Sequence, residues 1–466
     1  MNKSTGVHWG VNSNNNRNCW ILNWSDGNVN NNNLNNSNRV RPFAEYWVGS
    51  SGYNLYVMEK VDITLREEDA IIPFSDFVAA YYDCRKNKRQ SLSALEFEME
   101  WEYNVALLWQ EVNTYTYEIG ISDCFIVHKP KKREVFAASF RDRVIHHLLC
   151  RRIEPLFEAY FIDAAYNCRV GKGTLYGIKD LHEKIRMATN DYTEDAWVAK
   201  FDLQGFFMSV NRAKLWGLLE RFLMDRYEGD DKRLILWLAK KITLHAPEKN
   251  CRLKSPRSAW NGLPRNKSLF TNGEGIGLPI GNLPSQMFVN FLLTEFDYEV
   301  SDRFWYGRYV DDFFLIGDKR EILRLIPAMR DRLADLGLRM HPDKIYLQHY
   351  TKGIKFIGSV SKRGRLYWGN RTKLNFFRAI DELNMLPDKE SHLEEFITRY
   401  NSYAGHSLPF LAYAIRYSAY QRIDSEWFKY IYLSAGLRKA CIKRGSSEKY
   451  LLRKRIREER IYGFKI

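Results

Sequence analysis

The stretch Phe304-Trp305-Tyr306-Gly307-Arg308-Tyr309-Val310-Asp311-Asp312-Phe313-Phe314-Leu315-Ile316 places an acidic pair between two apolar and aromatic arms. This pattern predicts a β-hairpin whose arms are buried and whose turn carries the two carboxylates. Adjacent carboxylates repel each other unless water solvates them or divalent cations neutralise them, and hard oxygen ligands of this kind suit Mg²⁺. A surface Asp-Asp turn is the alternative interpretation of these residues alone.

A second acidic position lies upstream, in the stretch Trp197-Val198-Ala199-Lys200-Phe201-Asp202. The apolar run predicts a strand that ends at Asp202. A strand placed beside the hairpin would let Asp202, Asp311 and Asp312 hold two metal ions about 3.5 to 4 Å apart, the arrangement used for in-line displacement at phosphorus. The sequence therefore predicts a nucleotidyl-transfer site with these three catalytic aspartates. Taken singly, Asp202 fits an ordinary turn residue at the end of a strand better than a metal ligand.

Between the two acidic positions lies Gly277-Leu278-Pro279-Ile280-Gly281-Asn282-Leu283-Pro284-Ser285-Gln286. This segment resembles a motif of the reverse transcriptases of diversity-generating retroelements, and the resemblance extends over about residues 70 to 420. It implies an RNA-directed DNA polymerase of α+β fold, with fingers, a palm built on an antiparallel β-sheet, and a helical thumb. It also implies two Mg²⁺ ions, for which Mn²⁺ can substitute, held by Asp202, Leu203, Asp311 and Asp312.

A glycine-rich turn, Tyr166-Asn167-Cys168-Arg169-Val170-Gly171-Lys172-Gly173-Thr174, precedes a predicted helix. Its glycines allow the backbone to approach an anion closely, and the forked guanidinium of Arg169 can reach a triphosphate. The family resemblance assigns contacts with the incoming deoxynucleoside triphosphate to Arg169, Lys172, Phe207, Ile280, Gly281, Gln286 and Lys344.

Three of these nucleotide-binding residues have specific predicted roles. The family places at Phe207 the aromatic side chain that excludes a ribose 2′-hydroxyl, with core packing as the alternative. Lys344 is placed to donate a proton to the departing pyrophosphate or to neutralise it. Most reverse transcriptases carry Gln where this chain has Ile280, which offers neither donor nor acceptor and so predicts lower accuracy. The alternative is that Ile280 merely packs the loop.

Two further regions are predicted to contact the primer and template strands. The segment Gly353-Ile354-Lys355-Phe356-Ile357-Gly358 is interpreted as a hairpin that grips the primer. The basic C-terminal stretch would lie along phosphates and contribute salt-dependent affinity without sequence preference, although a solvated helix end explains the same charges. The predicted primer- and template-binding residues are Tyr309, Gly353, Lys355, Phe356, Gly358, Arg453, Lys454, Arg455 and Arg457.

The composition favours a polyanionic partner. The chain has 71 basic and 56 acidic residues, a formal net charge of +15, and 15% aromatic residues that can stack on bases. Its seven cysteines are odd in number and include no Cys-x-x-Cys pair, so neither a disulfide framework nor a zinc ribbon is predicted. No apolar run is long enough to span a bilayer and no signal-peptide core is present. We therefore expect a cytoplasmic protein without a membrane partner.

Four regions are predicted along the chain. Residues 1–43 form a polar tail in which Asn fills 15 of the first 38 positions. Because Asn favours turns over helix, this tail should be disordered or loop-rich. It also resembles the translation of an adenine-rich template repeat. A helical extension over 44–124, fingers and palm over 125–360, and a helical basic thumb and C-terminal tail over 361–466 are expected to follow.

The resemblance implies a retroelement that rewrites a variable gene by copying a template RNA with errors at adenine. Its implied partners are the template RNA, a primer strand, deoxynucleoside triphosphates and a small basic accessory protein. Two other functions fit the same residues. One is a related antiviral-defence reverse transcriptase that copies a dedicated noncoding RNA. The other is an RNA-binding module whose polymerase site is vestigial.

Overall fold

A computed structural model of the chain describes residues 71–86, 92–128 and 131–443, residue 445, and the backbone of six short strands between residues 7 and 64. The chain divides into two compact units. The first unit comprises Met1–Ile162, Leu203–Phe296 and Asp331–Arg339. The second comprises Asp163–Asp202, Asp297–Arg330 and Met340–Ile466. The chain thus passes from one unit to the other directly after Asp202.

The first unit is mainly helical. Strand β7 pairs antiparallel with β8 and parallel with the three-residue strand β10, and helix α4 packs against α1. Ser139 caps α4 by accepting a hydrogen bond from the backbone N–H of Asp142. The helices and strands of this unit are α1 Phe74–Arg85, α2 Leu92–Met99, α3 Trp101–Asn113, β7 Ser122–Val127, β8 Arg133–Ala137, α4 Phe140–Tyr160, α6 Phe206–Ser209, α7 Arg212–Arg226, α8 Lys232–Leu244, β10 Cys251–Leu253 and α9 Leu283–Ser301, whose last turn belongs to the second unit.

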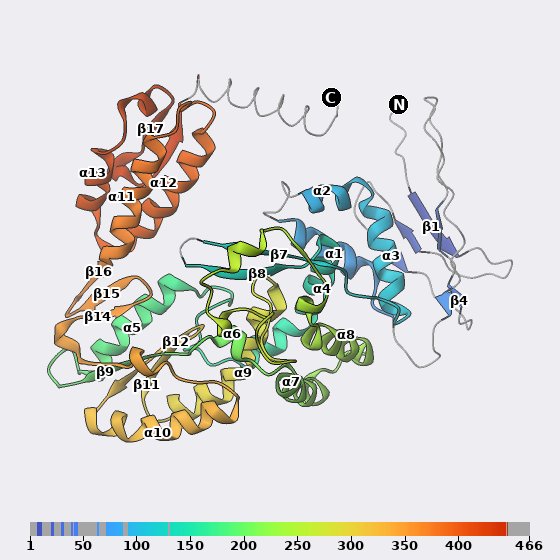
Figure 1. The fold of residues 1–466 in the computed structure, drawn as a ribbon, viewed down its shortest axis with the longest axis horizontal. Helices are drawn as coiled ribbons and strands as arrows, with labels where there is room; N and C mark the ends of the chain where they lie inside the picture. Colours follow the sequence, from blue (N-terminus) through green and yellow to red (C-terminus); the bar gives the residue numbers. More distant parts are fainter. Residues whose placement is uncertain are drawn as a thin grey trace. The chain divides into compact units, whose positions relative to one another are not determined.

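The second unit is built on an antiparallel four-stranded sheet of order β11-β12-β9-β13, followed by a three-stranded meander and a helical C-terminal part. Helix α5 packs on this sheet (Figure 1). The elements are α5 Thr174–Ala188, β9 Trp197–Asp202, β11 Trp305–Tyr309, β12 Asp312–Gly317, α10 Lys319–Asp335 (its C-terminal end in the first unit), β13 Tyr346–His349, β14 Ile354–Phe356, β15 Ser359–Lys362, β16 Arg365–Trp368, α11 Asn370–Asn384, α12 Leu393–Ser407, α13 Tyr413–Tyr420, β17 Ile431–Leu433 and β18 Ala440–Ile442.

Strand β12 is buried on both faces, which explains its unbroken apolar sequence. Successive side chains of a strand point to opposite faces. Phe314 and Ile316 join a core with Val198, and Phe313 stacks on Phe201 with ring centroids 4.9 Å apart on the opposite face. Burial of both faces anchors the strand whose first residue is Asp312, so the acidic turn is attached to a rigid part of the sheet.

The mixed helix and sheet fold predicted from the sequence is confirmed. Residues 246–275 contain strand β10 and three short 3₁₀ helices. The region 361–466, predicted to be a helical thumb and tail, also contains strand β16 and a small hairpin formed by β17 and β18. The two strands of this hairpin have three residues each, too few to show an alternating pattern.

The predicted tail, residues 1–43, lies largely outside the described residues, and the structure describes the backbone of strands β1 to β4 within that range and of β5, which begins there and ends at Ala44. Those strands are β1 Val7–Val11, β2 Trp20–Leu22, β3 Val29–Asn31, β4 Arg39–Val40 and β5 Pro42–Ala44; β6 Ile63–Thr64 follows. In the part of the chain that the structure describes, every helix is too short or too polar to cross a membrane.

Candidate active site

The acidic hairpin has the predicted geometry. Tyr309 of β11 pairs with Asp312 of β12, so Val310 and Asp311 form a two-residue turn. Strand β9 pairs antiparallel with β12, and the register places Asp202 directly opposite Asp312. Opposed residues of an antiparallel pair have Cβ atoms about 4.5 to 5.5 Å apart on one face of the sheet. The sheet therefore brings together the three aspartates predicted from the sequence.

The electrostatic environment of Asp311 disfavours its ionised form. Burial raises the pKa of the Asp311 carboxyl to about 6, and repulsion from Asp312 and Asp202 acts in the same direction. The charge of Lys344 opposes this shift. A cation bound at the turn would offset the repulsion, so the site has the electrostatic character of a cation-binding site.

Lys344 contacts the acidic cluster directly. Its Nζ lies 2.7 Å from Oδ1 of Asp202, and its side chain remains 46% exposed. The residue ends the short 3₁₀ helix Pro342–Lys344, and the backbone N–H of His341 donates to the carbonyl oxygen of Asp202 at 2.7 Å. The lysine predicted to act on pyrophosphate is thus positioned at Asp202, one of the three predicted catalytic carboxylates, by a backbone link to β9.

The carboxylates fit divalent cations by the chemistry of their oxygen donors. Among the described residues no group of three or more His, Cys, Asp or Glu side chains is arranged as a metal site, and Lys344 lies on one oxygen of Asp202. Asp202, Asp311 and Asp312 are nevertheless neighbours on one sheet, with the mutual repulsion that a divalent ion relieves. A metal ion bound at Oδ1 of Asp202 would compete with Lys344 for that oxygen.

The glycine-rich turn lies in the same unit as the aspartates. Cys168, Gly171 and Gly173 all have positive φ, which gives the turn its tight course. Nη1 of Arg169 donates to the carbonyl oxygen of Ala165 at 3.3 Å. Nζ of Lys172 lies 2.8 Å from Oδ1 of Asp163. Both predicted triphosphate ligands therefore contact their own segment, and Lys172 would exchange Asp163 for a bound phosphate.

The predicted primer-binding residues of the second unit differ in exposure. Tyr309 is half-buried and its hydroxyl accepts a hydrogen bond from Thr174 Oγ1 at 3.2 Å. Lys355 is exposed, whereas the side chain of Phe356 is 1% exposed and packs on Phe314. Any contact of Phe356 with a primer must therefore involve its backbone. Gly353 directly precedes β14 and Gly358 directly precedes β15, and both have positive φ. Arg453, Lys454, Arg455 and Arg457 lie outside the described residues.

The remaining predicted site residues, Leu203, Phe207, Ile280, Gly281 and Gln286, lie in the first unit. The carbonyl oxygen of Phe207 accepts from the backbone N–H of Leu278 at 2.7 Å, and Phe136 N–H donates to the carbonyl oxygen of Ile280 at 3.1 Å. A Cβ on Gly281 would lie 3.0 Å from Val135. Helix α6 and strand β8 thus hold the loop that carries Ile280 and Gly281. Gln286 is exposed on α9.

Glu134 is a structural anchor that the sequence did not reveal. Its side chain is fully buried on β8 and accepts hydrogen bonds from Trp260 Nε1 at 2.6 Å, Ser268 Oγ at 2.6 Å and Leu269 N–H at 2.7 Å. The segment 260–269 is therefore fixed to the strand that also holds Ile280. A Glu in an alternating strand gives no sign of burial, so only the paired indole and hydroxyl donors could have suggested it.

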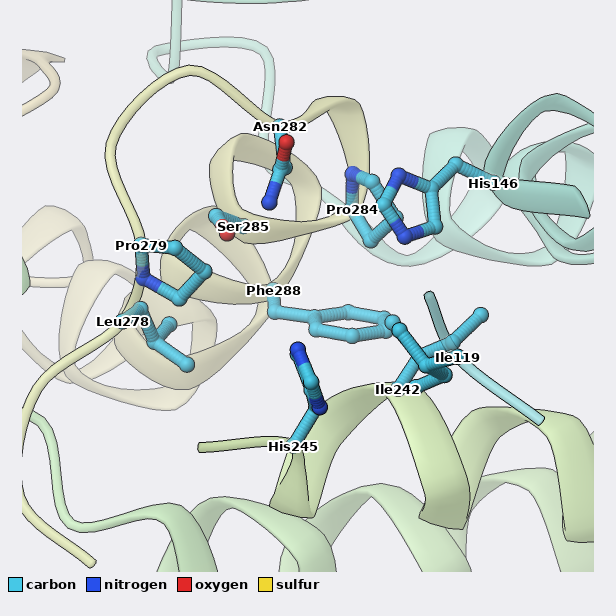
Figure 2. Close-up of a pocket in the computed structure, with 10 residues that line it drawn as sticks. All are labelled: Ile119, His146, Ile242, His245, Leu278, Pro279, Asn282, Pro284, Ser285 and Phe288. Carbon is cyan, nitrogen blue, oxygen red and sulfur yellow. The ribbon is translucent and has the colours of Figure 1, made fainter. Parts of the chain in front are cut away.

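A small cavity lies beside the loop that carries Ile280 and Gly281 (Figure 2). Its walls include Leu278, Pro279, His146 and His245, and its volume is about 20 Å³. Burial lowers the pKa of His146 to about 4, so this imidazole is neutral near pH 7. Nδ1 of His146 and Nε2 of His245 hydrogen-bond to no described residue. A space of this size is comparable to one water molecule and excludes a nucleotide.

Comparison with known families identifies the class of protein. Residues 127–360, half of the chain, match the family described as reverse transcriptase (RNA-dependent DNA polymerase). The chain therefore belongs to this family, and the matched segment contains Asp202, Asp311 and Asp312. Reverse transcriptases generally use divalent metal ions.

Individual relatives are distant. Protein YkfC of Escherichia coli K12 is 24% identical over 274 residues, which cover 50% of this chain and 65% of YkfC. Apo telomerase of Candida tropicalis aligns with a TM-score of 0.42 at 11% identity, covering 72% of this chain and 61% of that chain. Telomerase of Candida albicans, in complex with a fragment of telomeric RNA, aligns with a TM-score of 0.38 at 11% identity, covering 65% and 58% of the two chains.

Proposed function

We propose that the protein is an RNA-directed DNA polymerase that adds deoxynucleotides to the 3′-hydroxyl of a primer. The observation that carries this proposal is the register that sets Asp202 opposite Asp312, with Asp311 on the adjoining turn, inside the segment that matches the reverse transcriptase family. In this proposal the sheet β11-β12-β9-β13 belongs to the palm, strands β7 and β8 to the fingers, and helices α11 to α13 to the thumb.

The residues have distinct tasks in this reaction. Two Mg²⁺ ions, when bound by Asp202, Leu203, Asp311 and Asp312, would activate the primer hydroxyl and stabilise the charge that develops on the leaving group. Arg169 and Lys172 hold the triphosphate through charge-assisted hydrogen bonds. Lys344, which contacts Asp202, donates a proton to the departing pyrophosphate or neutralises it.

We further propose that this polymerase serves a diversity-generating retroelement and copies its template RNA with errors at adenine. The motif with Ile280 in place of Gln supports this role. A small basic accessory protein and a structured template RNA are the expected partners. The antiviral-defence function has the same catalytic residues. A pair of neighbouring DNA repeats that differ at adenines would favour the retroelement, and a neighbouring gene for a dedicated noncoding RNA would favour defence.

The polymerase proposal is tested by primer extension with the purified chain. A labelled DNA primer on an RNA template should be extended when Mg²⁺ and all four deoxynucleotides are present, and extension should stop when a chelator removes the metal. An inactive wild-type protein that still binds RNA, with and without Mn²⁺ and a basic accessory protein, would favour the vestigial RNA-binding module.

Phe207 is expected to make the enzyme select deoxynucleotides over ribonucleotides. It is half-buried with its ring 5.9 Å from that of Phe206, and its backbone supports the loop of Ile280. Phe207→Val should raise ribonucleotide incorporation relative to deoxynucleotide, because the smaller side chain leaves room for a 2′-hydroxyl. The ratio of kcat/KM for the two nucleotides measures this effect. Phe270→Val removes the same atoms from a 43% exposed phenylalanine and serves as the control. An unchanged ratio in active Phe207→Val protein would leave Phe207 a packing residue.

Ile280 is expected to lower fidelity. Its side chain is partly buried against a cluster that includes Phe136 and Leu269, so packing alone also explains it. Ile280→Gln adds an amide that can hydrogen-bond the incoming nucleotide, and one such bond corresponds to roughly two- to tenfold in discrimination. Misincorporation opposite each template base should fall for Ile280→Gln and stay at the wild-type level for Ile280→Leu, which keeps the site apolar. Equal error rates opposite adenine in all three enzymes would contradict the fidelity role.

A further inference from the structure

The turn that carries Asp311 has a backbone conformation unusual for its sequence. Val310, the residue before Asp311, has a φ of 59°. This left-handed region suits glycine, and a β-branched side chain adopts it only when its surroundings impose it. The two-residue turns that require positive φ at their first position normally place glycine, asparagine or aspartate there, and not a β-branched residue. The structure must therefore hold Val310 by contacts outside the turn.

Two side chains supply those contacts, one to the backbone N–H of Val310 and the other to its carbonyl oxygen. Oδ1 of Asn167 accepts a hydrogen bond from the Val310 N–H at 2.9 Å. Nη1 of Arg308 donates to the Val310 carbonyl oxygen at 3.2 Å. The Val310 carbonyl belongs to the peptide bond that leads directly into Asp311. Both backbone groups of the strained residue are thus fixed by side chains.

The two holding side chains are themselves anchored. Arg308 is fully buried, and its Nε and Nη2 donate to the two oxygens of buried Asp297 at 2.7 and 2.6 Å. Tyr306 adds a hydrogen bond from its hydroxyl to the same carboxylate at 2.5 Å. Asn167 is 2% exposed. A buried, paired guanidinium has little freedom, so the position of the Val310 carbonyl is tied to the sheet.

The segment around Asn167 also carries the predicted triphosphate ligands. It runs beside β11, where Tyr166 N–H donates to the Arg308 carbonyl oxygen at 2.9 Å and Arg308 N–H donates to the Ala164 carbonyl oxygen at 2.8 Å. Arg169 follows Asn167 by two residues, and Lys172 by five. One short segment therefore contacts the catalytic turn at Val310 and presents the two cations assigned to the nucleotide.

We propose that Asn167 is a positioning residue that joins the nucleotide-binding turn to the catalytic hairpin, holding Val310 in its left-handed conformation so that Asp311 faces Asp202 and Asp312. This inference rests on the proposed polymerase function. It implies that the carboxylate geometry depends on a side chain outside the Tyr-x-Asp-Asp motif. The hydrogen bond from Val310 N–H to Asn167 Oδ1 connects the nucleotide-binding turn to the hairpin.

The test is a double-mutant cycle between Asn167 and Val310. Asn167→Leu, which keeps the size and removes the acceptor, should lower kcat for primer extension by roughly tenfold, the upper range for one lost hydrogen bond. Affinity for the RNA template should stay within about twofold. In the Val310→Gly background the same change should cost much less, because glycine adopts positive φ without strain. Asn167→Asp retains the acceptor and should recover part of the activity.

Two further measurements separate positioning from general stability. Amide hydrogen exchange in the peptide containing Val310 should accelerate in Asn167→Leu protein. Asn113, 4% exposed in the first unit, is the matched control, because its Oδ1 accepts from Ile72 N–H at 2.8 Å. Asn113→Leu should lower the melting temperature and leave kcat unchanged.

Three outcomes would overturn the inference. The first is unchanged kcat in folded Asn167→Leu protein. The second is an equal loss of activity when Asn167→Leu is made in the wild-type background and in the Val310→Gly background. The third is a pattern in which both Leu variants lose only thermal stability. If wild-type protein itself extends no primer, the proposed function fails instead, and the exchange measurement still tests whether Asn167 holds the turn.

Discussion

Asp311→Asn is expected to abolish primer extension while leaving RNA affinity nearly unchanged. In the proposed site the Asp311 carboxylate would contribute charge to a divalent cation, and an amide cannot supply that charge. RNA binding depends mainly on basic side chains and phosphates, which this substitution does not alter. Primer extension and a filter-binding titration on the same preparation measure the two effects. Substantial extension by the purified variant would contradict the assignment of Asp311 as a metal ligand.

The same substitution should stabilise the metal-free protein. The pKa of Asp311 is raised from 3.8 to about 6, so ionising this carboxyl costs more in the folded state than in the unfolded state. That penalty is absent below pH 3.8, grows as the pH rises toward 6, and is constant above it. At pH 7.5 Asp311→Asn should therefore raise the free energy of unfolding by about 1 to 3 kcal/mol.

The gain in stability from Asp311→Asn can be checked against a control substitution and by its dependence on pH. Asp302→Asn makes the same change at an exposed aspartate and should leave the free energy of unfolding nearly constant. Denaturant titrations without metal should show the gain from Asp311→Asn shrinking between pH 6 and pH 4, and added Mg²⁺ should narrow it by stabilising the wild type. If Asp311→Asn is less stable than wild type at pH 7.5, ionisation of Asp311 does not destabilise the folded protein.

Lys344→Met should lower the rate of turnover and raise the affinity of the free protein for Mn²⁺. Turnover should fall by roughly 100-fold, because the variant would lose the group that we propose donates a proton to pyrophosphate or neutralises its charge. Binding of Mn²⁺ to the free protein should become tighter, because the ammonium group 2.7 Å from Asp202 competes with a metal ion for that oxygen. Single-turnover kinetics measures the first effect and paramagnetic resonance of Mn²⁺ the second.

The charge-matched control for Lys344 is Lys240→Met, on the exposed face of α8 in the first unit. This variant should change neither turnover nor Mn²⁺ binding. If Lys344→Met retains wild-type turnover, the lysine is only a partner of Asp202. If turnover falls but Mn²⁺ affinity does not rise, the ion pair with Asp202 does not compete with metal.

The catalytic hairpin was predictable because its information is local. Apolar arms around Asp311 and Asp312 define a buried hairpin, and the run before Asp202 defines a strand that ends in a carboxylate. Pairing of β9 with β12 then follows, because each strand needs a neighbour for its backbone groups. These elements and the site could therefore be derived from pattern and motif, and the structure shows the aspartates of both strands opposed.

The supports of the site were not predictable from the same patterns. Asn167 looked like one polar residue of a turn, since asparagine is common in turns for its own local hydrogen bonds. The pairing of Arg308 with Asp297 depends on how the end of α9 meets β11, which no periodicity encodes. Lys344 was found by its motif, but its contact with Asp202 depends on the course of the chain after α10.

The anchoring of segment 260–269 by Glu134 has a consequence for protein engineering. Trp260 and Ser268 are both tied to one buried carboxylate, whereas all but Leu263 of the seven residues between them are exposed. A chain fixed at both ends tolerates added length between the fixed points at little entropic cost. Residues 262–264, which precede the 3₁₀ helix Arg265–Lys267 that contacts α6, are therefore a suitable place to insert a fluorophore-binding tag.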